Sequence, residues 1–437
     1  MNGNNHNKPE DHVAILGAGI GGLATGILLS KYGWRVTVIE KDSPPWSRLG
    51  ESFDWEMPQF LEQLGFNLEE LKQQEILTSK PGVIIWSNGR HNMNVAKLFP
   101  PAAYLKFMNR PEATFHGNRY KLDMMLLEKC KQLGTRYISK KIKKVHMENN
   151  RVKKVELAGG NSVNAHYYID ASGRAGLITR AAGVKYKFYG EKMISLYRRH
   201  EHDYDGRGTR LYLLDKGKHV IWFWNIHVGL HTTDIGIVIP SSYYTTFKLK
   251  ELTTEDIYRK LLRQVSPLAD FVDSAGEVGT LHTCGFRNYV ADRATGDNWI
   301  AVGESAFLID PISSGGVTAA LRAGKSAALI VDEALKLGER SLGVSSRKRY
   351  YNRISLQADF VNELTQYLWK FHRLWHFIGL PRFARMLTFP QWHINWLSST
   401  INMRSNPGLL CIIVIRHLLL GTVKVILHTL NFRYRNL

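Results

Sequence analysis

Cysteine, long apolar runs and, near the C-terminus, acidic residues are scarce in this sequence of 437 residues. Its three cysteines lie far apart and show neither metal-ligand spacing nor a disulfide framework, which favours a reducing compartment. The sequence contains no run of about 18 or more apolar residues, so we predict no transmembrane helix. The polar N-terminal segment lacks the apolar core of a secretion signal. We therefore expect a cytoplasmic protein of two or three domains without a metal site.

Acidic residues are so few that the formal net charge is +20, and this charge is unevenly distributed. From Ser341 onward the chain holds 13 lysines and arginines but only two acids, Asp359 and Glu363. Such an excess of positive charge suits nucleic acid, an anionic membrane or an acidic partner protein. The sequence contains no zinc finger, RNA-binding signature or basic zipper, so we expect no nucleic-acid partner.

Glycine is concentrated in "GAGIGG", which has the spacing Gly17-x-Gly19-x-x-Gly22. The apolar run before it predicts a strand, the pattern after it predicts a helix, and a second predicted strand ends at Glu40. In this order the glycines permit a tight turn, and the helix N-terminus binds a dinucleotide pyrophosphate. Glu40 is then placed to accept hydrogen bonds from the ribose hydroxyls.

Later stretches of the sequence favour FAD over NAD as this dinucleotide. "YYIDASGRAG" contains Asp170 and resembles a second flavoprotein signature. In "NWIAVGESAFLIDPISSGG", a predicted strand ends in Gly303-Glu304 and a helix starts near Gly316. The N-terminal dipole of that helix can face the flavin pyrimidine edge, where reduced flavin carries negative charge.

Together with "RLGES" at 48–52, these motifs resemble the FAD-containing monooxygenase fold over residues 13–328. The resemblance implies an α/β chain with a Rossmann-like FAD-binding domain of the aromatic-hydroxylase type, an inserted antiparallel β-sheet substrate domain and a C-terminal helical region. Three strand-like runs between Arg210 and Pro240 suit the insert. We predict a discontinuous FAD-binding domain at 1–195 and 276–340, the insert at 196–275, and a basic, mostly helical region at 341–437.

The resemblance assigns FAD binding to residues of these motifs and to one arginine shortly before a predicted helix, in "NRYKLD". They are Gly17, Gly19, Gly22, Glu40, Arg48, Arg119, Asp170, Gly303, Glu304, Asp310 and Gly316. One of them departs from the family pattern, because Asp is usual at the position of Glu304. The longer side chain is expected to alter the contact with the ribityl chain.

Within this fold the chain resembles the flavin-dependent halogenases. "GES" after the first βαβ unit is typical of them, and "SKPGVIIW" resembles their K-x-G…W segment, which places the catalytic lysine at Lys80. "WFWNIH" resembles their W-x-W-x-I-P motif, with Trp222 and Trp224 matched and His227 in place of the proline. The tryptophan pair is expected to keep the organic substrate away from the flavin.

The segment expected beside the flavin, "DPISSGG", has Ser313 where tryptophan halogenases carry Glu, followed by Ser314. Without that carboxylate, the resemblance implies an electron-rich ring of the phenol or pyrrole type, free or bound to a carrier protein, in specialised metabolism. Reduced FAD, oxygen and a halide ion would yield hypohalous acid, and Lys80 would pass it to the ring by hydrogen bonding or as a haloamine. No second nucleotide loop is evident, so we expect a separate flavin reductase.

Alternatives remain open at this point. An aromatic hydroxylase or an isoprenoid-chain reductase of the same fold would need neither Lys80 nor the tryptophan pair, and a membrane-associated flavin-binding protein without chemistry is a third possibility. The tail at 408–430 predicts an amphipathic helix. Its basic stripe consists of Arg416, His417, Lys424 and His428. Docking on the protein body, contact with an anionic membrane and oligomer formation all fit this pattern.

Overall fold

The computed structural model describes residues 12–46, 48–87, 91–94, 114–269, 276–374 and 406–433. A five-stranded parallel sheet has the order β17-β11-β1-β2-β7. Its strands are β1 (His12–Leu16), β2 (Arg35–Glu40), β7 (Arg136–Ser139), β11 (Tyr167–Asp170) and β17 (Trp299–Ala301). β1 is almost wholly buried, as expected for a parallel strand covered on both faces. Helix α1 (Ile20–Lys31) contacts both α5 (Arg119–Gln132) and α10 (Gly316–Lys336). The expected Rossmann-like α/β class is confirmed.

A second, eight-stranded sheet has the order β18-β16-β12-β15-β14-β13-β4-β5. Its strands are β4 (Val83–Ser87), β5 (His91–Asn94), β12 (Tyr186–Glu201), β13 (Thr209–Asp215), β14 (Val220–His227), β15 (Thr232–Pro240), β16 (Gly276–Ala291) and β18 (Phe307–Leu308). β13, β14 and β15 form the antiparallel meander that the sequence predicts. The sheet extends beyond the predicted insert, since β12 starts before it, β16 ends after it, and β4 pairs parallel to β13. The division into domains stays a prediction.

Smaller elements connect and flank the two sheets. β3 (Leu77–Lys80) and β6 (Thr114–Gly117) form an antiparallel two-stranded ribbon. β8 (Ile142–Glu148), β9 (Arg151–Leu157) and β10 (Ser162–Val163) form a third sheet. The remaining short helices are α2 (Met57–Gln63), α3 (Leu68–Gln73), α6 (Leu177–Ala181), α7 (Ser241–Thr246) and α8 (Thr254–Leu262). Lys80, the lysine that the resemblance makes catalytic, is the last residue of β3.

Strand β14 is buried on both faces, and its alternating side chains enter two different cores. Ile221 and Phe223 belong to the core that includes residues of α8. Trp222 and Trp224 belong to a core that includes Phe360 of α11 (Val344–Lys370). We call the latter the sheet–helix core. Large aromatic rings make strong contributions to such cores, so this strand joins the sheet firmly to the helical region.

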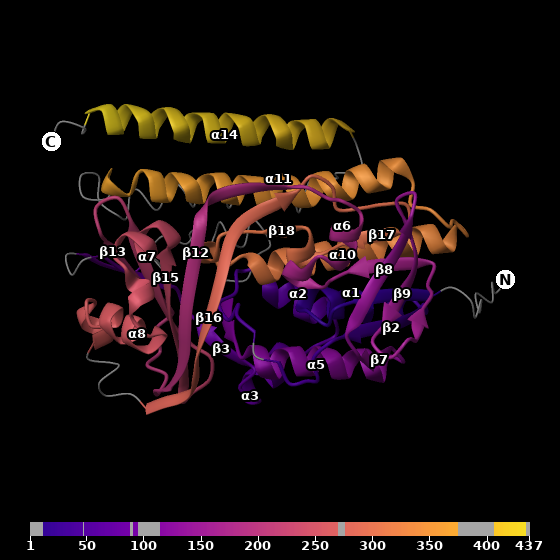
Figure 1. The fold of residues 1–437 in the computed structure, drawn as a ribbon, viewed down its shortest axis with the longest axis horizontal. Helices are drawn as coiled ribbons and strands as arrows, with labels where there is room; N and C mark the ends of the chain where they lie inside the picture. Colours follow the sequence, from indigo (N-terminus) through magenta and orange to yellow (C-terminus); the bar gives the residue numbers. More distant parts are fainter. Residues whose placement is uncertain are drawn as a thin grey trace.

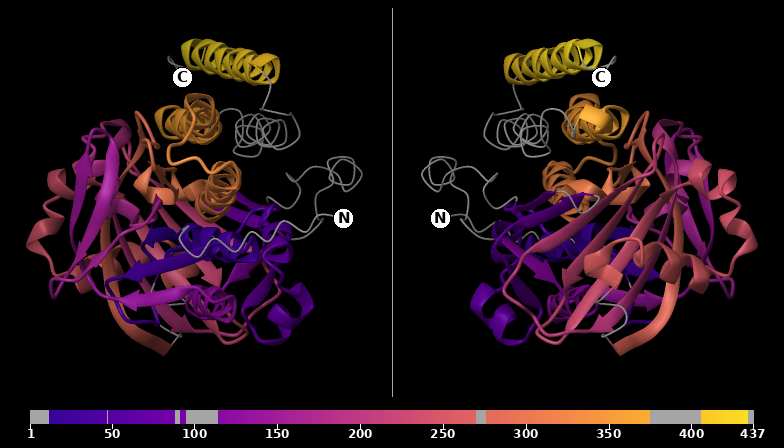
Figure 2. Two further views of the ribbon diagram at one scale, coloured as in Figure 1. Left: turned by 90° about the vertical axis from the view of Figure 1, so that its right-hand side faces the viewer. Right: turned by 90° about the vertical axis from the view of Figure 1, so that its left-hand side faces the viewer.

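Helix α14 (Asn406–Arg433) is the outermost layer and runs beside α11 (Figures 1 and 2). Its Leu420, Val423 and Leu427 side chains are buried in the sheet–helix core. The predicted basic stripe is wrong at Arg416, which is buried and pairs with Glu363 of α11 at 3.4 Å. Arg416 can face inward because the carboxylate of Glu363 provides a partner for its positive charge. Residues 375–405 and 434–437 of the predicted helical region lie outside the described residues.

The exposed face of α14 carries both basic and apolar side chains. The other residues of the predicted stripe, His417, Lys424 and His428, are exposed, together with apolar side chains of the outer face. Among the described helices, none is long and apolar enough to cross a lipid bilayer.

Candidate active site

The glycine loop between β1 and α1 divides into two close-packed positions and one open position. Gly17 has φ +105°, and a Cβ there would lie 2.3 Å from the carbonyl oxygen of Ala171. A Cβ at Gly22 would lie 2.5 Å from the carbonyl oxygen of Gly17. At Gly19 a Cβ would meet only Ala171 O, at 3.7 Å. Gly19 is also the uncapped N-cap of α1, so N–H groups of the first turn remain available to a pyrophosphate beside it.

The carboxylate of Glu40 lies directly beside this loop. Its Oε2 accepts from the backbone N–H of Ala18 at 2.9 Å, and its Oε1 accepts from that of Lys41 at 2.8 Å. Arg48 donates to the same Oε2 at 3.1 Å. These three donors fix the carboxylate at the end of β2, where a ribose bound next to the loop would meet it.

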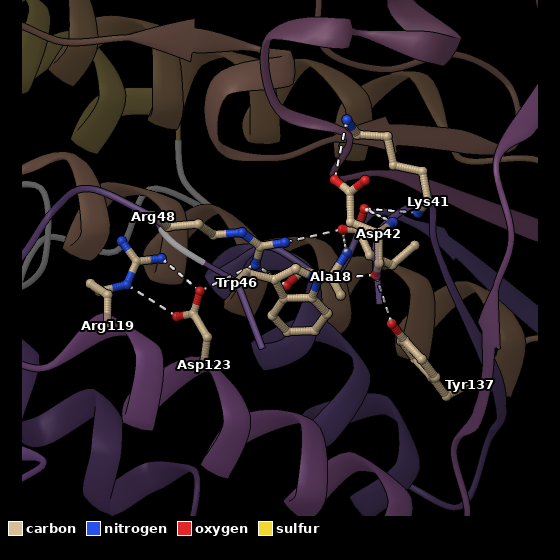
Figure 3. A network of polar contacts seen from close by, with 9 residues as sticks. Ala18, Lys41, Asp42, Trp46, Arg48, Arg119, Asp123 and Tyr137 are labelled. Atoms are coloured by element: carbon tan, nitrogen blue, oxygen red, sulfur yellow. Dashed lines mark hydrogen bonds and ion pairs between the residues drawn. The ribbon is translucent and has the colours of Figure 1, made fainter. Parts of the chain in front are cut away.

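Arg48 also joins this carboxylate to a second ion pair. Figure 3 shows Arg48 between the Ala18 turn and Asp123, with Arg119 on the far side of Asp123. Arg48 Nη1 lies 3.2 Å from Asp123 Oδ2, and Arg119 donates to both Asp123 oxygens at 3.0 and 3.1 Å. Arg119 further donates to the carbonyl of Leu49. Buried Arg119 therefore holds the 48–52 segment in place. This segment belongs to the part of the chain that is expected to lie around the FAD.

Sequence analysis missed Asp123, although the buried carboxylate completes this network. It stands four residues after Arg119 on one face of α5, and that spacing is typical of helical ion pairs. The i,i+4 spacing could have revealed the pair, whereas the contact with Arg48 depends on the tertiary fold.

Asp170 of the second signature links the start of α6 to the turn η4 (Gly303–Ser305). Buried Asp170, at the end of β11, accepts from the backbone N–H groups of Ile178 at 2.7 Å and Thr179 at 3.0 Å. It also accepts from the hydroxyl of Ser305 at 3.0 Å. Asp170 therefore positions the start of α6 and the turn η4 rather than offering free oxygens.

Residues of η4 itself are more open. Gly303 has φ +59°, a conformation that favours glycine. The side chain of Glu304 is 48% exposed, and its Oε2 lies 3.4 Å from Arg174 Nε. Glu304 is thus able to meet a ligand, as the resemblance requires.

The segment before α10 places Asp310, Ser313, Ser314 and Gly316. Buried Asp310 accepts from Trp369 Nε1 at 3.0 Å and Asn288 Nδ2 at 3.2 Å, and burial raises the pKa of its carboxyl group. Its carboxyl group therefore ties the segment to α11 and β16. Ser313 Oγ donates to Asp310 O at 2.8 Å, and Ser314 has φ +52°. A Cβ at Gly316 would meet nothing within 4 Å, so the N-terminus of α10 has open space beside it.

Lys80 is buried at the end of β3, with 4% of its surface exposed. Its Nζ donates to the carbonyl oxygen of Phe53 at 2.7 Å, and that oxygen also accepts from Thr114 Oγ1 at 3.1 Å. Burial lowers the pKa of Lys80 to about 8, against the attraction of Asp54, which raises it. Lys80 is consequently a shielded amine that can hold or lose its proton near neutral pH.

Carboxyl groups of the 51–54 segment are also unusual. Burial, with repulsion from Asp234, raises the pKa of Glu51 to about 8. Burial, with repulsion from Glu56, raises the pKa of Asp54 to about 6. Strongly perturbed titratable groups gathered at one place are characteristic of functional sites. Sequence analysis did not single out Glu51 or Asp54.

Trp222 and Trp224 lie side by side, with ring centroids 5.7 Å apart. A Cβ at Gly236 would lie 2.0 Å from the Trp224 ring, so the glycine on the neighbouring strand makes room for the indole. Leu49 of the 48–52 segment and Ile312 of the DPISS segment pack against the same sheet–helix core. The pair is thus placed beside the two segments expected to face the flavin.

These observations fit FAD. The open Gly19 position, the anchored Glu40 carboxylate and the open N-terminus of α10 offer donors, an acceptor and space of the kinds that a dinucleotide and a flavin ring require.

Two family models match the sequence, one described as tryptophan halogenase over residues 86–371 and one as NAD(P)-binding Rossmann-like domain over residues 15–67. The chain is 27% identical to the 1H-pyrrole-2-carbonyl-[peptidyl-carrier protein] brominase of Pseudoalteromonas luteoviolacea, over 74% of this chain and 77% of that protein. It is 23% identical to the digeranylgeranylglycerophospholipid reductase of Haloferax volcanii, over 77% of this chain and 80% of that protein.

Solved structures resemble this fold along most of the chain. The flavin-dependent brominase Bmp2 has a TM-score of 0.71 at 21% identity, covering 86% of this chain and 93% of its own. Halogenase PltM in complex with phloroglucinol and FAD has a TM-score of 0.68 at 17% identity, covering 98% and 96%.

Proposed function

Because this chain belongs to the tryptophan halogenase family of FAD-dependent enzymes, we propose that it halogenates an electron-rich aromatic ring by way of Lys80. The family membership rests on a match over residues 86–371. The choice of Lys80 and of the ring type is our own inference from the site.

The burial of Lys80 carries the proposal. A lysine in a passage for hypohalous acid must be shielded from bulk water, since otherwise the oxidant escapes. The amine beside the Phe53 carbonyl meets that requirement. With a pKa of about 8, Lys80 is mostly an ammonium at neutral pH and can donate a hydrogen bond to hypohalous acid. The neutral form, which grows in as the pH rises, can instead form a haloamine.

FAD would be held by the Gly19 turn, Glu40 and the network of Arg48, Asp123 and Arg119, with Glu304 and the N-terminus of α10 toward its flavin end. When bound and reduced, FAD supplies the reaction of oxygen with halide that yields hypohalous acid. The chain's own residues would orient the cofactor and exclude water, and Trp222 and Trp224 share a core with Leu49, Ile312 and side chains of α11.

The proposed substrate is a phenol- or pyrrole-type ring. Ser313 provides no carboxylate at the position where tryptophan halogenases carry one, so a ring that reacts without such help is favoured. The relative from Pseudoalteromonas luteoviolacea is named for a carrier-bound pyrrole. A carrier protein with an acidic surface would suit the basic region after Ser341. We expect a separate reductase to supply reduced flavin.

We also propose a peripheral membrane contact through α14. Its outer face exposes Leu418 and Val425, each 65% exposed, beside the cation Lys424. An apolar face flanked by positive charge suits the surface of an anionic bilayer.

A reductase of isoprenoid chains is the second candidate, favoured by the Haloferax volcanii relative. It requires neither Lys80 nor a halide, so the two candidates are readily separated.

Replacing Lys80 tests the proposal. Lys80→Ala should abolish halogenation while the reduced flavin is still oxidised by oxygen at the wild-type rate, because the lysine acts after hypohalous acid forms. Halogenated product by mass spectrometry and flavin oxidation by absorbance give the two readouts. Lys72→Ala, at an exposed lysine of α3 paired with Glu69, is the control and should retain both. If Lys80→Ala halogenates at the wild-type rate, Lys80 is not the catalytic lysine.

A further inference from the structure

Two buried histidines lie near Lys80 and are not used by the proposed reaction. His116 and His227 have no exposed surface. In the antiparallel register Lys80 pairs with Thr114 and Thr78 pairs with His116, so Lys80 and His116 lie diagonally on one face of the β3–β6 ribbon. Lys80 and His227 both interact electrostatically with His116. The three groups therefore form a connected buried set.

Several ring nitrogens in this set lack a protein hydrogen-bond partner. His116 Nε2 hydrogen-bonds with Thr209 Oγ1 at 2.8 Å, whereas its Nδ1 has no partner within hydrogen-bond distance, although the backbone of His227 lies close to the ring. Neither nitrogen of His227 has a partner within that distance, although the backbone of Thr232 lies close to the ring and Asp205 Oδ1 lies 3.9 Å from Nε2. A buried polar group that is left unpaired destabilises the fold. Buried water normally satisfies it, and 3.9 Å is a separation across which a water can bridge.

The surroundings keep both rings neutral. Burial lowers the pKa of His116 well below its usual value, and repulsion from Lys80, His227 and Arg210 lowers it further. Burial, with repulsion from Arg210, lowers the pKa of His227 to about 4, against the attraction of Asp205. A neutral imidazole carries one N–H and one free acceptor, so it can accept a proton at one nitrogen and release a proton from the other.

We propose that His116 and His227 form a water-bridged proton path from Lys80 to solvent at Asp205. The path answers a need of the haloamine route, in which Lys80 must lose a proton while its amine is shielded from bulk water. The side chain of Asp205 is 32% exposed and provides the outlet. In the outward direction an N–H bond of Lys80 breaks, its electron pair stays on nitrogen, and one proton appears in solvent after successive transfers.

His227 is the member of the path at which this chain departs from the family motif. It stands at the position where the W-x-W-x-I-P motif has Pro, and a proline there offers no ring acceptor. The rings of His202 and Tyr204 pack on His227 with centroids 5.4 Å away, and Tyr204 donates to the carbonyl of Ser79 beside Lys80 at 2.9 Å. These contacts hold the His227 ring near the lysine strand.

The test measures proton exchange at Lys80 by NMR in FAD-loaded, full-length protein with labelled lysine, the Lys80 signal being assigned by its loss in Lys80→Arg. His116→Gln and His227→Phe should each slow exchange of the Lys80 Nζ protons on the order of tenfold. Each should also lower the halogenation rate without changing flavin oxidation. His200→Gln, at a buried histidine that hydrogen-bonds with Tyr258, is the control and should exchange at the wild-type rate.

If His116→Gln or His227→Phe is folded and its Lys80 Nζ protons exchange at the wild-type rate, the proposal is wrong. Flavin absorbance and circular dichroism establish whether each variant is folded. If one variant does not fold, the other decides. The inference rests on the proposed role of Lys80 but fails separately from it. Slowed exchange together with full halogenation by Lys80→Ala would support the path and refute the halogenation role.

Discussion

At the scale of single residues, burial of Lys80 has a thermodynamic consequence. Its pKa is lowered from 10.5 to about 8, so between these pH values the folded state binds fewer protons than the unfolded state. The free energy of unfolding should therefore rise with pH across that window. Below pH 8 the full cost of desolvating the ammonium is present.

Lys80→Met should consequently stabilise the FAD-free protein at pH 7 by roughly 1–3 kcal/mol. Thr114 still donates to Phe53 O in this variant, so no buried acceptor is left unpaired. The advantage should shrink as the pH approaches 10.5, and denaturant unfolding at several pH values measures it. A variant less stable than wild type at pH 7 would show that the ammonium contributes net stability.

Asp123 is the second residue whose contribution is measurable. Asp123→Asn removes the negative charge between Arg48 and Arg119 while keeping the size of the side chain. Buried Arg119 would then lose its carboxylate partner and Arg48 would keep only Glu40, so we expect a loss of roughly 3 kcal/mol in stability and weaker FAD binding. Unfolding and flavin titration give the two readouts. Asp256→Asn, at an exposed N-terminal position of α8, is the control, and equal effects of the two substitutions would refute the network's role.

At the scale of elements, the glycine loop permits a paired experiment. Gly17→Ala should destabilise the fold by roughly 2 kcal/mol or more, since its φ is positive and the new Cβ would meet Ala171 O. Gly19→Val should leave the FAD-free fold intact, because its Cβ has only one distant neighbour, and should abolish FAD binding. Thermal unfolding and flavin fluorescence separate the two effects. Undiminished flavin binding by Gly19→Val would contradict the placement of the pyrophosphate.

Helix α14 has two faces that can be tested independently. Leu427→Ala empties a fully buried position in the sheet–helix core and should cost roughly 2–4 kcal/mol. Leu418→Ser with Val425→Ser changes two exposed positions and should leave stability within about 0.5 kcal/mol.

The same double variant should sediment less with phosphatidylserine vesicles, and added salt should weaken the binding of the wild type. Wild-type sedimentation of the double variant would remove the membrane contact from α14.

Features set by short sequence spacings could be predicted from the sequence, whereas features set by contacts between distant residues could not. The glycine loop, Glu40 and the meander are encoded by short spacings, so they could be predicted directly. The parallel pairing of β4 with β13 and the inward turn of Arg416 depend on partners far away in the chain. The same holds for the burial of Lys80 against Phe53, 27 residues before it. Charge patterns along one helix could not show which face the body of the protein would cover.

At the scale of the whole molecule, the parallel sheet, the eight-stranded sheet and the β3–β6 ribbon bring together a dinucleotide loop, a buried lysine and a tryptophan pair. The parallel sheet carries the dinucleotide loop, the β3–β6 ribbon carries Lys80, and the sheet–helix core carries the tryptophan pair. In the proposed function, this arrangement would separate the FAD from the ring to be modified, with the shielded amine of Lys80 as the link. Halogenation of the ring, rather than hydroxylation or reduction, is the central claim.

Product mass tests that claim most directly. The protein would be incubated with FAD, a flavin reductase, NADH, oxygen and a panel of phenols and carrier-bound pyrroles, with and without bromide. We predict a brominated product with the bromine isotope doublet that requires bromide and is absent with Lys80→Ala. A hydroxylated or reduced product formed equally without bromide would contradict the account.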